Sequence, residues 1–538
     1  TPKPSSAASD VYKRQGYDLP VSSFLNKLDG TMESGVAIKE KRAIATEVPK
    51  WVKENCIQCN NCVMVCPHAT IRAFLIDDEE LANAPEDISN DVLTPMGKGV
   101  DGLVYRIQVS PDSCVGCGLC AQVCPGKKGE KALQMVNVKE ELSHAPLADY
   151  MYSKVTYKDD KYPLTTVKGV GFMKPYFEVS GACGGCGETP YYRLASQLFG
   201  SDMIIANATG CSSIYTGSTP STPMTIDENG HGPAWANSLF EDNAEFGFGM
   251  KLASNYKTKH ILEVMEKTKD QVEAPLADAF NQYIEVKGNR AKEKELYDTL
   301  IDLINASSNE EVKDILNYKG DLVSKSQWII GGDGWAYDIG YGGVDHVLAN
   351  DQNVNILVLD TEVYSNTGGQ SSKSSQAGSI AKFTAGGKAV AKKDLAQIAM
   401  AYGHVYVAQV SMGANPMQTI KAFKEAEAYD GPSLIIAYSP CMEHGIKGGL
   451  ANHQAQQKAA VECGYFNLLR YDPRLEDEGK NPLQLDSKTP NFEEFRNFLL
   501  SENRFAQLLK VNAEHAEELM AKCEADAKKR RARLERML

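Results

Sequence analysis

The sequence has no apolar run close to the roughly 18 residues that cross a bilayer, so it predicts no membrane-spanning helix. Its start lacks a basic stretch followed by an apolar one, which predicts a cytoplasmic protein without a secretory signal. Positive charge is also scarce, because 57 Lys and Arg stand against 70 Asp and Glu, for a formal net charge of −13. With one short basic run at Lys528–Arg531, this balance argues against a general nucleic-acid-binding protein.

The chain has an ordinary globular composition, with 43% hydrophobic and 24% charged residues, which excludes a disordered or fibrous protein. Its 538 residues predict several domains. The expected division is an artefact of cloning or sequencing (1–15), a connector (16–48), a cysteine-rich ferredoxin-like domain with a linker (49–174) and a larger domain (175–538).

From about residue 175 onward, short apolar runs alternate with helical segments. The predicted strands are Met203–Asn207, Gln327–Ile330, Val354–Leu359, Val405–Val410 and Ser433–Ala437, and the predicted helices between them are Tyr337–Ala349, Asp394–Tyr402 and Met417–Tyr429. Because the strands are apolar on nearly every residue, they predict a doubly wound α/β fold with a buried parallel sheet. Two charged segments predict a helical insertion at about 255–317 and a C-terminal amphipathic helix at 513–538.

Eight of the 14 cysteines lie in two copies of the pattern C-x₂-C-x₂-C-x₃-C-P. This is the run of bacterial two-cluster ferredoxins, in which the fourth cysteine ligates the other 4Fe-4S cluster. Zinc usually binds cysteine pairs with longer spacers, so two iron–sulfur clusters are the better interpretation. The predicted ligand sets are Cys56, Cys59, Cys62 and Cys124 for one cluster, and Cys114, Cys117, Cys120 and Cys66 for the second.

Oxygen-bearing side chains follow the predicted strands at the edge where open α/β sheets bind ligands. Asp333 offers a carboxylate, Thr361 a hydroxyl and Val363 a backbone carbonyl, which are ligands suited to Mg²⁺ together with substrate phosphates. Gly332 and Gly334 would let a diphosphate approach the backbone.

A further set of four cysteines is spread over three distant segments. Cys183 and Cys186 form a C-x₂-C pair, while Cys211 and Cys441 each follow a predicted strand beside the diphosphate-binding loops. Their placement favours a third cluster, although the spacing leaves zinc open for this set.

These blocks resemble pyruvate:ferredoxin (flavodoxin) oxidoreductases, in particular the carboxyl-terminal part of the large single-chain type. The resemblance runs from about Gly16 to about Leu509, and its specific parts are the double ferredoxin run, Cys183–Tyr191 and Gly332–Gln370. It implies oxidative decarboxylation of pyruvate with CoA to acetyl-CoA and CO₂. Thiamine diphosphate, Mg²⁺ and three 4Fe-4S clusters are the implied cofactors, and electrons pass singly to ferredoxin or flavodoxin.

The resemblance also implies roles for individual residues. Cys183, Cys186, Cys211 and Cys441 resemble the ligands of the cluster nearest thiamine, Asp333, Thr361 and the Val363 carbonyl resemble the Mg²⁺ ligands, Glu188 resembles the thiamine-contacting acid and Asn366 the polar residue facing the reacting carbon. Family members are about twice as long, and their amino-terminal half has no counterpart here. We therefore expect a fragment that is inactive alone and forms a homodimer when complete.

Two alternatives stay open: another 2-oxoacid as the substrate, or an electron-transfer subunit without decarboxylase activity of its own. Lys127, Lys128 and Lys131 are candidates for a patch that docks an acidic electron acceptor. His444, near Cys441, is interpreted as structural.

Overall fold

The computed structural model describes residues 18–31, 33–217 and 221–538, so the expected artefact at 1–15 lies outside the described residues. An eight-stranded sheet has the order β14-β13-β11-β12-β8-β7-β5-β6. Its strands are β5 (Met203–Ala208), β6 (Ala234–Ser238), β7 (Ser326–Gly332), β8 (Asn355–Asp360), β11 (Tyr406–Val410), β12 (Ser433–Tyr438), β13 (Leu469–Tyr471) and β14 (Leu483–Leu485). From β11 to β6 all neighbours are parallel, whereas β13 and β14 add an antiparallel edge.

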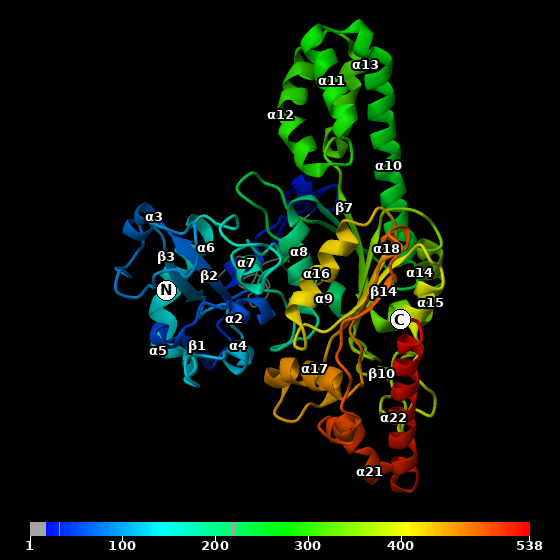
Figure 1. The fold of residues 1–538 in the computed structure, drawn as a ribbon. Helices are drawn as coiled ribbons and strands as arrows, with labels where there is room; N and C mark the ends of the chain where they lie inside the picture. Colours follow the sequence, from blue (N-terminus) through cyan, green and yellow to red (C-terminus); the bar gives the residue numbers. More distant parts are fainter. Residues whose placement is uncertain (1–17, 32, 218–220) are drawn as a thin grey trace.

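Both faces of this sheet are buried, as expected for strands that are apolar on successive residues. On one face, Trp328 and Leu357 pack under α8 (Thr189–Phe199) and α16 (Pro416–Glu427). On the other, Ile329 and Ile356 pack under α14 (Tyr341–Leu348) and α15 (Leu395–Met400). Figure 1 shows α8 and α16 between the cysteine-rich domain and the sheet. The predicted doubly wound α/β fold is confirmed.

The cysteine-rich domain consists of two short antiparallel strand pairs and two small helices. The elements are β1 (Glu47–Trp51) paired with β4 (Leu133–Asn137), β2 (Ile71–Ile76) paired with β3 (Val104–Val109), α2 (Asn61–Val65) and α4 (Leu119–Val123). The two cysteine repeats have matching backbones, because Gln58 and Asn60 have positive φ and so do Gly116 and Gly118 at the same places of the second repeat. Each repeat therefore folds into the same left-handed turns before its helix.

A helical projection stands out from the sheet (Figure 1). It contains α10 (Asn243–Thr268), α11 (Ala274–Val286), α12 (Arg290–Ala306) and α13 (Glu310–Lys313), which share a core of their own. The first helix of the projection, α10, begins at Asn243, before the predicted position 255, and its first turns pack on the sheet through Ala244.

The C-terminal helix α22 (Ala513–Glu535) buries one face rather than lying free on the surface. Met520 and Cys523 pack in a third core with α17 (His453–Glu462) and α19 (Phe495–Leu500). Among the described residues, no helix combines the length and the apolar character that a membrane crossing needs.

Candidate functional site: three cysteine groups and an oxygen-rich loop

The eight repeat cysteines surround two separate cavities. One cavity is lined by Cys56, Cys59, Cys62 and Cys124, which we call the outer group, and the other by Cys66, Cys114, Cys117 and Cys120, which we call the middle group. The crosswise exchange has a local cause. Cys66 and Cys124 end α2 and α4 in an extended conformation, with ψ of 118° and 115°, so each leaves its own repeat. The structure thus brings together the same two sets that the spacing predicts.

The thiols of these groups are buried and act electrostatically on one another. Burial, with smaller contributions from Cys66 and Cys117, raises the pKa of the Cys114 thiol to about 12. Burial and the neighbouring thiols likewise raise the pKa of Cys62 and Cys120 well above the usual value. Four thiolates are unfavourable in such a cavity unless positive charge is bound among them, so the donor set fits an iron–sulfur cluster.

The inner group, which is Cys183, Cys186, Cys211 and Cys441, comes from three separate segments. Cys211 begins α9 (Cys211–Gly217) directly after β5, and Cys441 follows β12 at the same edge of the sheet. Cys183 and Cys186 act electrostatically on the Cys211 thiol and raise its pKa, although burial is the larger cause. In the described part of the chain, no three Cys, His, Asp or Glu side chains meet as a single metal ion requires.

The three groups follow one another in space. Cys62 of the outer group acts on the Cys120 thiol of the middle group. Burial raises the pKa of Cys117, and the backbone N–H of Gly185, between the inner cysteines, donates to this sulfur and opposes the rise. His453, buried and neutral because burial lowers its pKa to about 4, bonds through Nδ1 to the Gly185 carbonyl at 2.7 Å. The inner segment is therefore held directly against the middle group.

The predicted Mg²⁺ ligands also converge, where Asp333 meets the loop at residues 361–369 after β8, which we call the oxygen-rich loop. Thr361 Oγ1 lies 3.0 Å from Asp333 Oδ1 and 3.0 Å from the Val363 carbonyl oxygen. Ser372 Oγ donates to the other Asp333 oxygen at 2.6 Å. Burial and the nearby Asp360 raise the pKa of Asp333 well above its usual value. A divalent cation bound by these three oxygens would offset both effects, so the donor set fits Mg²⁺.

A buried ion-pair network supports this loop, and sequence reasoning missed it. Lys392 Nζ contacts Asp360 at 2.6 Å and Glu362 at 3.0 Å, while Arg504 contacts Glu362 at 2.8 Å. Glu362 stands between two predicted metal ligands with a φ of 60°, a strained value for a side chain of this kind. Burial opposes its charge, yet Lys392 and Arg504 hold the pKa of Glu362 well below its usual range. The ion pairs of Lys392 and Arg504 thus hold Glu362, and with it the loop, in place.

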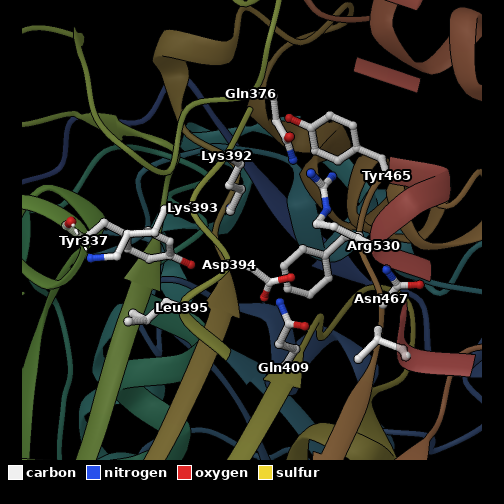
Figure 2. Close-up of a pocket in the computed structure, with 12 residues that line it drawn as sticks. Tyr337, Gln376, Lys392, Lys393, Asp394, Leu395, Gln409, Tyr465, Asn467 and Arg530 are labelled. Carbon is white, nitrogen blue, oxygen red and sulfur yellow. Dashed lines mark hydrogen bonds between the residues drawn. The ribbon is translucent and has the colours of Figure 1, made fainter. Parts of the chain in front are cut away.

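A small polar cavity of about 30 Å³ lies beside this network (Figure 2). Figure 2 shows Lys392 and Lys393 on one side of it, and Tyr465 and Arg530 on the other. Its volume suits one or two water molecules. The predicted metal ligands do not line this cavity, so it lies outside the candidate site.

Glu188 and Asn366 occupy contrasting environments. The Glu188 side chain is buried beside the inner cysteines, and burial raises its pKa to about 7. Among the described residues its Oε2 atom has no hydrogen-bond partner, as expected where a carboxyl group faces a cofactor. Asn366 lies exposed in the turn between β9 (Val363–Tyr364) and β10 (Gln370–Ser371).

The remaining predicted positions divide. A Cβ atom at Gly334 would meet the Tyr364 ring at 2.5 Å, so glycine is needed there for packing, whereas Gly332 is open. Lys127 and Lys128 are exposed. Lys131 is half-buried and donates to the Ala121 and Gln122 carbonyls near the end of α4, and its place in the docking patch stays a prediction.

Two family models match the chain. A 4Fe-4S dicluster domain matches residues 55–128, which contain the outer and middle groups. The C-terminal TPP-binding domain of thiamine pyrophosphate enzymes matches residues 321–437, which contain the oxygen-rich loop.

Curated proteins are similar over nearly the whole chain. Pyruvate:ferredoxin oxidoreductase of Moorella thermoacetica is 52% identical over 96% of this chain and 44% of its own length. Pyruvate-flavodoxin oxidoreductase of Klebsiella pneumoniae is 49% identical over 97% and 44%. Mitochondrial pyruvate dehydrogenase [NADP(+)] of Euglena gracilis is 45% identical over 97% and 29%. The chain thus spans less than half the length of the relatives it matches. It is a homologue of part of the pyruvate:ferredoxin and pyruvate-flavodoxin oxidoreductases, with an iron–sulfur dicluster domain and a thiamine pyrophosphate-binding domain.

Proposed function

We propose that the chain is the carboxyl-terminal part of an enzyme that oxidises pyruvate with CoA to acetyl-CoA and CO₂. Electrons leave one at a time for ferredoxin or flavodoxin. The observation that carries this proposal is the serial contact of three cysteine groups, which begins at the oxygen-rich loop and ends at the outer group. At the loop end of the series, Cys211 Sγ lies 3.2 Å from Ser365 Oγ.

The proposed cofactors are three 4Fe-4S clusters, thiamine diphosphate and Mg²⁺. When bound, thiamine diphosphate supplies an electron sink for decarboxylation and the clusters supply single-electron carriers. The outer, middle and inner groups would each hold one cluster. Asp333, Thr361 and the Val363 carbonyl would hold Mg²⁺, Gly332 and Gly334 would border the diphosphate, and Glu188 and Asn366 would contact the thiamine.

The chain's own residues contribute fixed charges and shape. Asp333 brings a negative charge to the metal position, and Ser372 and Thr361 orient it by hydrogen bonds. His444 Nε2 lies 2.7 Å from the Thr361 carbonyl oxygen, so this histidine positions the oxygen-rich loop. Such preorganised groups need little rearrangement when a charged ligand binds.

Iron and sulfide analysis tests the cluster assignment. Anaerobically purified chain should contain iron and acid-labile sulfide equivalent to three clusters. Zinc in place of iron at the inner group would refute the third cluster, and zinc throughout would refute the electron path.

Decarboxylation of pyruvate should require the amino-terminal part of the relatives, to which this chain has no matching residues. In thiamine enzymes the aminopyrimidine is activated by a carboxylate from a second α/β domain. The described residues contain one large sheet, which carries the oxygen-rich loop. The chain alone should therefore fail to decarboxylate pyruvate, and adding the amino-terminal half of a relative should restore CoA-dependent oxidation. Substantial oxidation by the chain alone would refute this domain assignment.

The same reconstituted enzyme distinguishes the alternatives. If another 2-oxoacid turns over faster than pyruvate, that acid is the substrate instead of pyruvate. If the clusters can be reduced but thiamine diphosphate does not bind, the chain is an electron-transfer subunit. A homodimeric complete enzyme also belongs to this proposal. A cytoplasmic location belongs to it as well, because the cysteines that would hold the clusters stay reduced in that compartment.

A further inference from the structure

Arg193 differs from every other buried arginine of the described residues. Each of the others has a carboxylate partner: Arg72 with Glu178, Arg106 with Asp91, Arg470 with Glu425 and Asp486, Arg504 with Glu362 and Glu502, and Arg531 with Glu535. Arg193 is 1% exposed, and no Asp or Glu of the described ranges forms an ion pair with it. Its charge lacks a carboxylate to balance it.

The hydrogen bonds of Arg193 go to neutral acceptors. Nη1 donates to Gln197 Oε1 at 2.6 Å, and Nη2 donates to the Met64 carbonyl. Nε has no partner among the described side chains and backbone groups. Burying a charged guanidinium with only neutral partners lowers the stability of the folded chain unless an anion lies nearby. The surroundings of Arg193 therefore point to an anion that the side chains of acidic residues do not supply.

The middle cysteine group lies beside this guanidinium. Arg193 is on α8, which packs against α2, and Met64 stands two residues before Cys66. Burial lowers the pKa of Arg193 to about 10, while Cys66 acts in the opposite direction. The other charged group that faces it is Arg72, which is already paired with Glu178. A cluster bound through Cys66 would therefore bring negative charge close to this guanidinium.

We propose that Arg193 is the buried counter-ion of the cluster held by the middle group and raises its reduction potential. The proposal rests on the proposed function, since it needs a cluster at Cys66. Reduction adds one electron and one negative charge to that cluster, and Arg193 keeps its proton throughout. A fixed positive charge therefore stabilises the reduced form more than the oxidised form, and an adjacent charge commonly shifts such an equilibrium by about one to three powers of ten.

The test is a potentiometric titration of the reconstituted full chain, followed by electron paramagnetic resonance under anaerobic conditions. The middle signal is identified by its loss in Cys120→Ala. Arg193→Gln should make that cluster at least tenfold harder to reduce at a fixed potential, which is about 59 mV for one electron. Arg193→Lys keeps the charge, and Gln197→Leu removes an acceptor for Arg193 and a donor to the Met173 carbonyl but no charge, so each should shift the potential by less than half as much.

An unchanged potential in Arg193→Gln, or an equal shift in Gln197→Leu, would overturn the counter-ion role. If Arg193→Gln does not take up the middle cluster, the double variant Arg193→Gln/Gln197→Lys returns a positive charge one helical turn away. Cluster uptake with a potential near the original supports the proposal, and continued failure overturns it. Absence of a middle cluster from the unaltered chain would instead refute the proposed function, so the two failures are distinguishable.

Discussion

Replacing Asp333 by Asn should separate the binding role of this carboxylate from its effect on the fold. The substitution keeps the shape and the oxygen that accepts from Thr361, but removes the negative charge. Without ligand, the melting temperature should stay unchanged or rise, because burial and Asp360 both disfavour that charge. With Mg²⁺ and thiamine diphosphate, the variant should lose most of the stabilisation that the unaltered chain gains.

The size of this loss follows from mass action. A ligand at 100 times its dissociation constant stabilises the folded chain by about 2.7 kcal/mol. An unfolding entropy of roughly 2.1 cal/mol/K per residue, over the roughly 360 residues of the proposed larger domain, converts this into about 3–4 °C. Differential scanning fluorimetry with and without Mg²⁺ resolves such a shift, and calorimetry gives the affinity directly.

Asp338→Asn is the matched control. Asp338 lies five residues farther along the chain, in the short helix Gly334–Ile339, and it pairs with Lys373 at 3.1 Å instead of facing Thr361. Its variant should keep the full ligand-induced shift. A full shift in Asp333→Asn would show that the diphosphate binds elsewhere. An equal loss in both variants would show that loss of either negative charge in this short segment has the same effect, and would refute a specific role for Asp333.

Three further changes test the electron path and the loop. Cys59→Ser should leave Mg²⁺-dependent thiamine binding intact but block reduction of ferredoxin by the enzyme completed with its other half; full ferredoxin reduction would exclude Cys59 from the path. Charge reversal at Lys127 and Lys128 should slow ferredoxin reduction at low salt without slowing an artificial dye, and equal loss with both acceptors would reject a docking role. His444→Leu removes the contact to the Thr361 carbonyl and should weaken calorimetric thiamine diphosphate binding about tenfold, whereas unchanged affinity would mean that His444 does not position the loop.

The central strands were predictable because burial on both faces leaves a run of apolar residues in the sequence. The predicted strand Val354–Leu359 differs by one residue at each end from β8, every residue of which is buried. By contrast, β6 was not predicted, because all its residues are exposed or half-buried and its polar side chains carry no strand signal. The two antiparallel strands β13 and β14 have three residues each, which is too short for a periodicity.

The site divides in the same way. Fixed spacing reveals ligands when the local turn decides their position, as in the two cysteine repeats. Strand ends reveal ligands when parallel strands share an edge, as with Asp333 and Thr361. The supporting charges could not be predicted, because Glu362 and Arg504 are 142 positions apart and meet only through tertiary packing. One local signal existed, since an acidic residue stands between two candidate metal ligands, but its partners do not follow from sequence.

The exchange of Cys66 and Cys124 between the repeats has a mechanical consequence for the whole chain. Each of the first two groups contains cysteines from both repeats, so filling either group fixes α2 against α4. Arg193 then ties α2 to α8, whose N-terminal end adjoins the inner cysteine Cys186. Under the proposed function, cluster assembly in the dicluster domain would thereby be coupled to the packing of α8 on the large sheet. In the proposed electron path, this shared packing would set the distance between the middle and inner groups, and α8 is the element through which a change in one domain would reach the other.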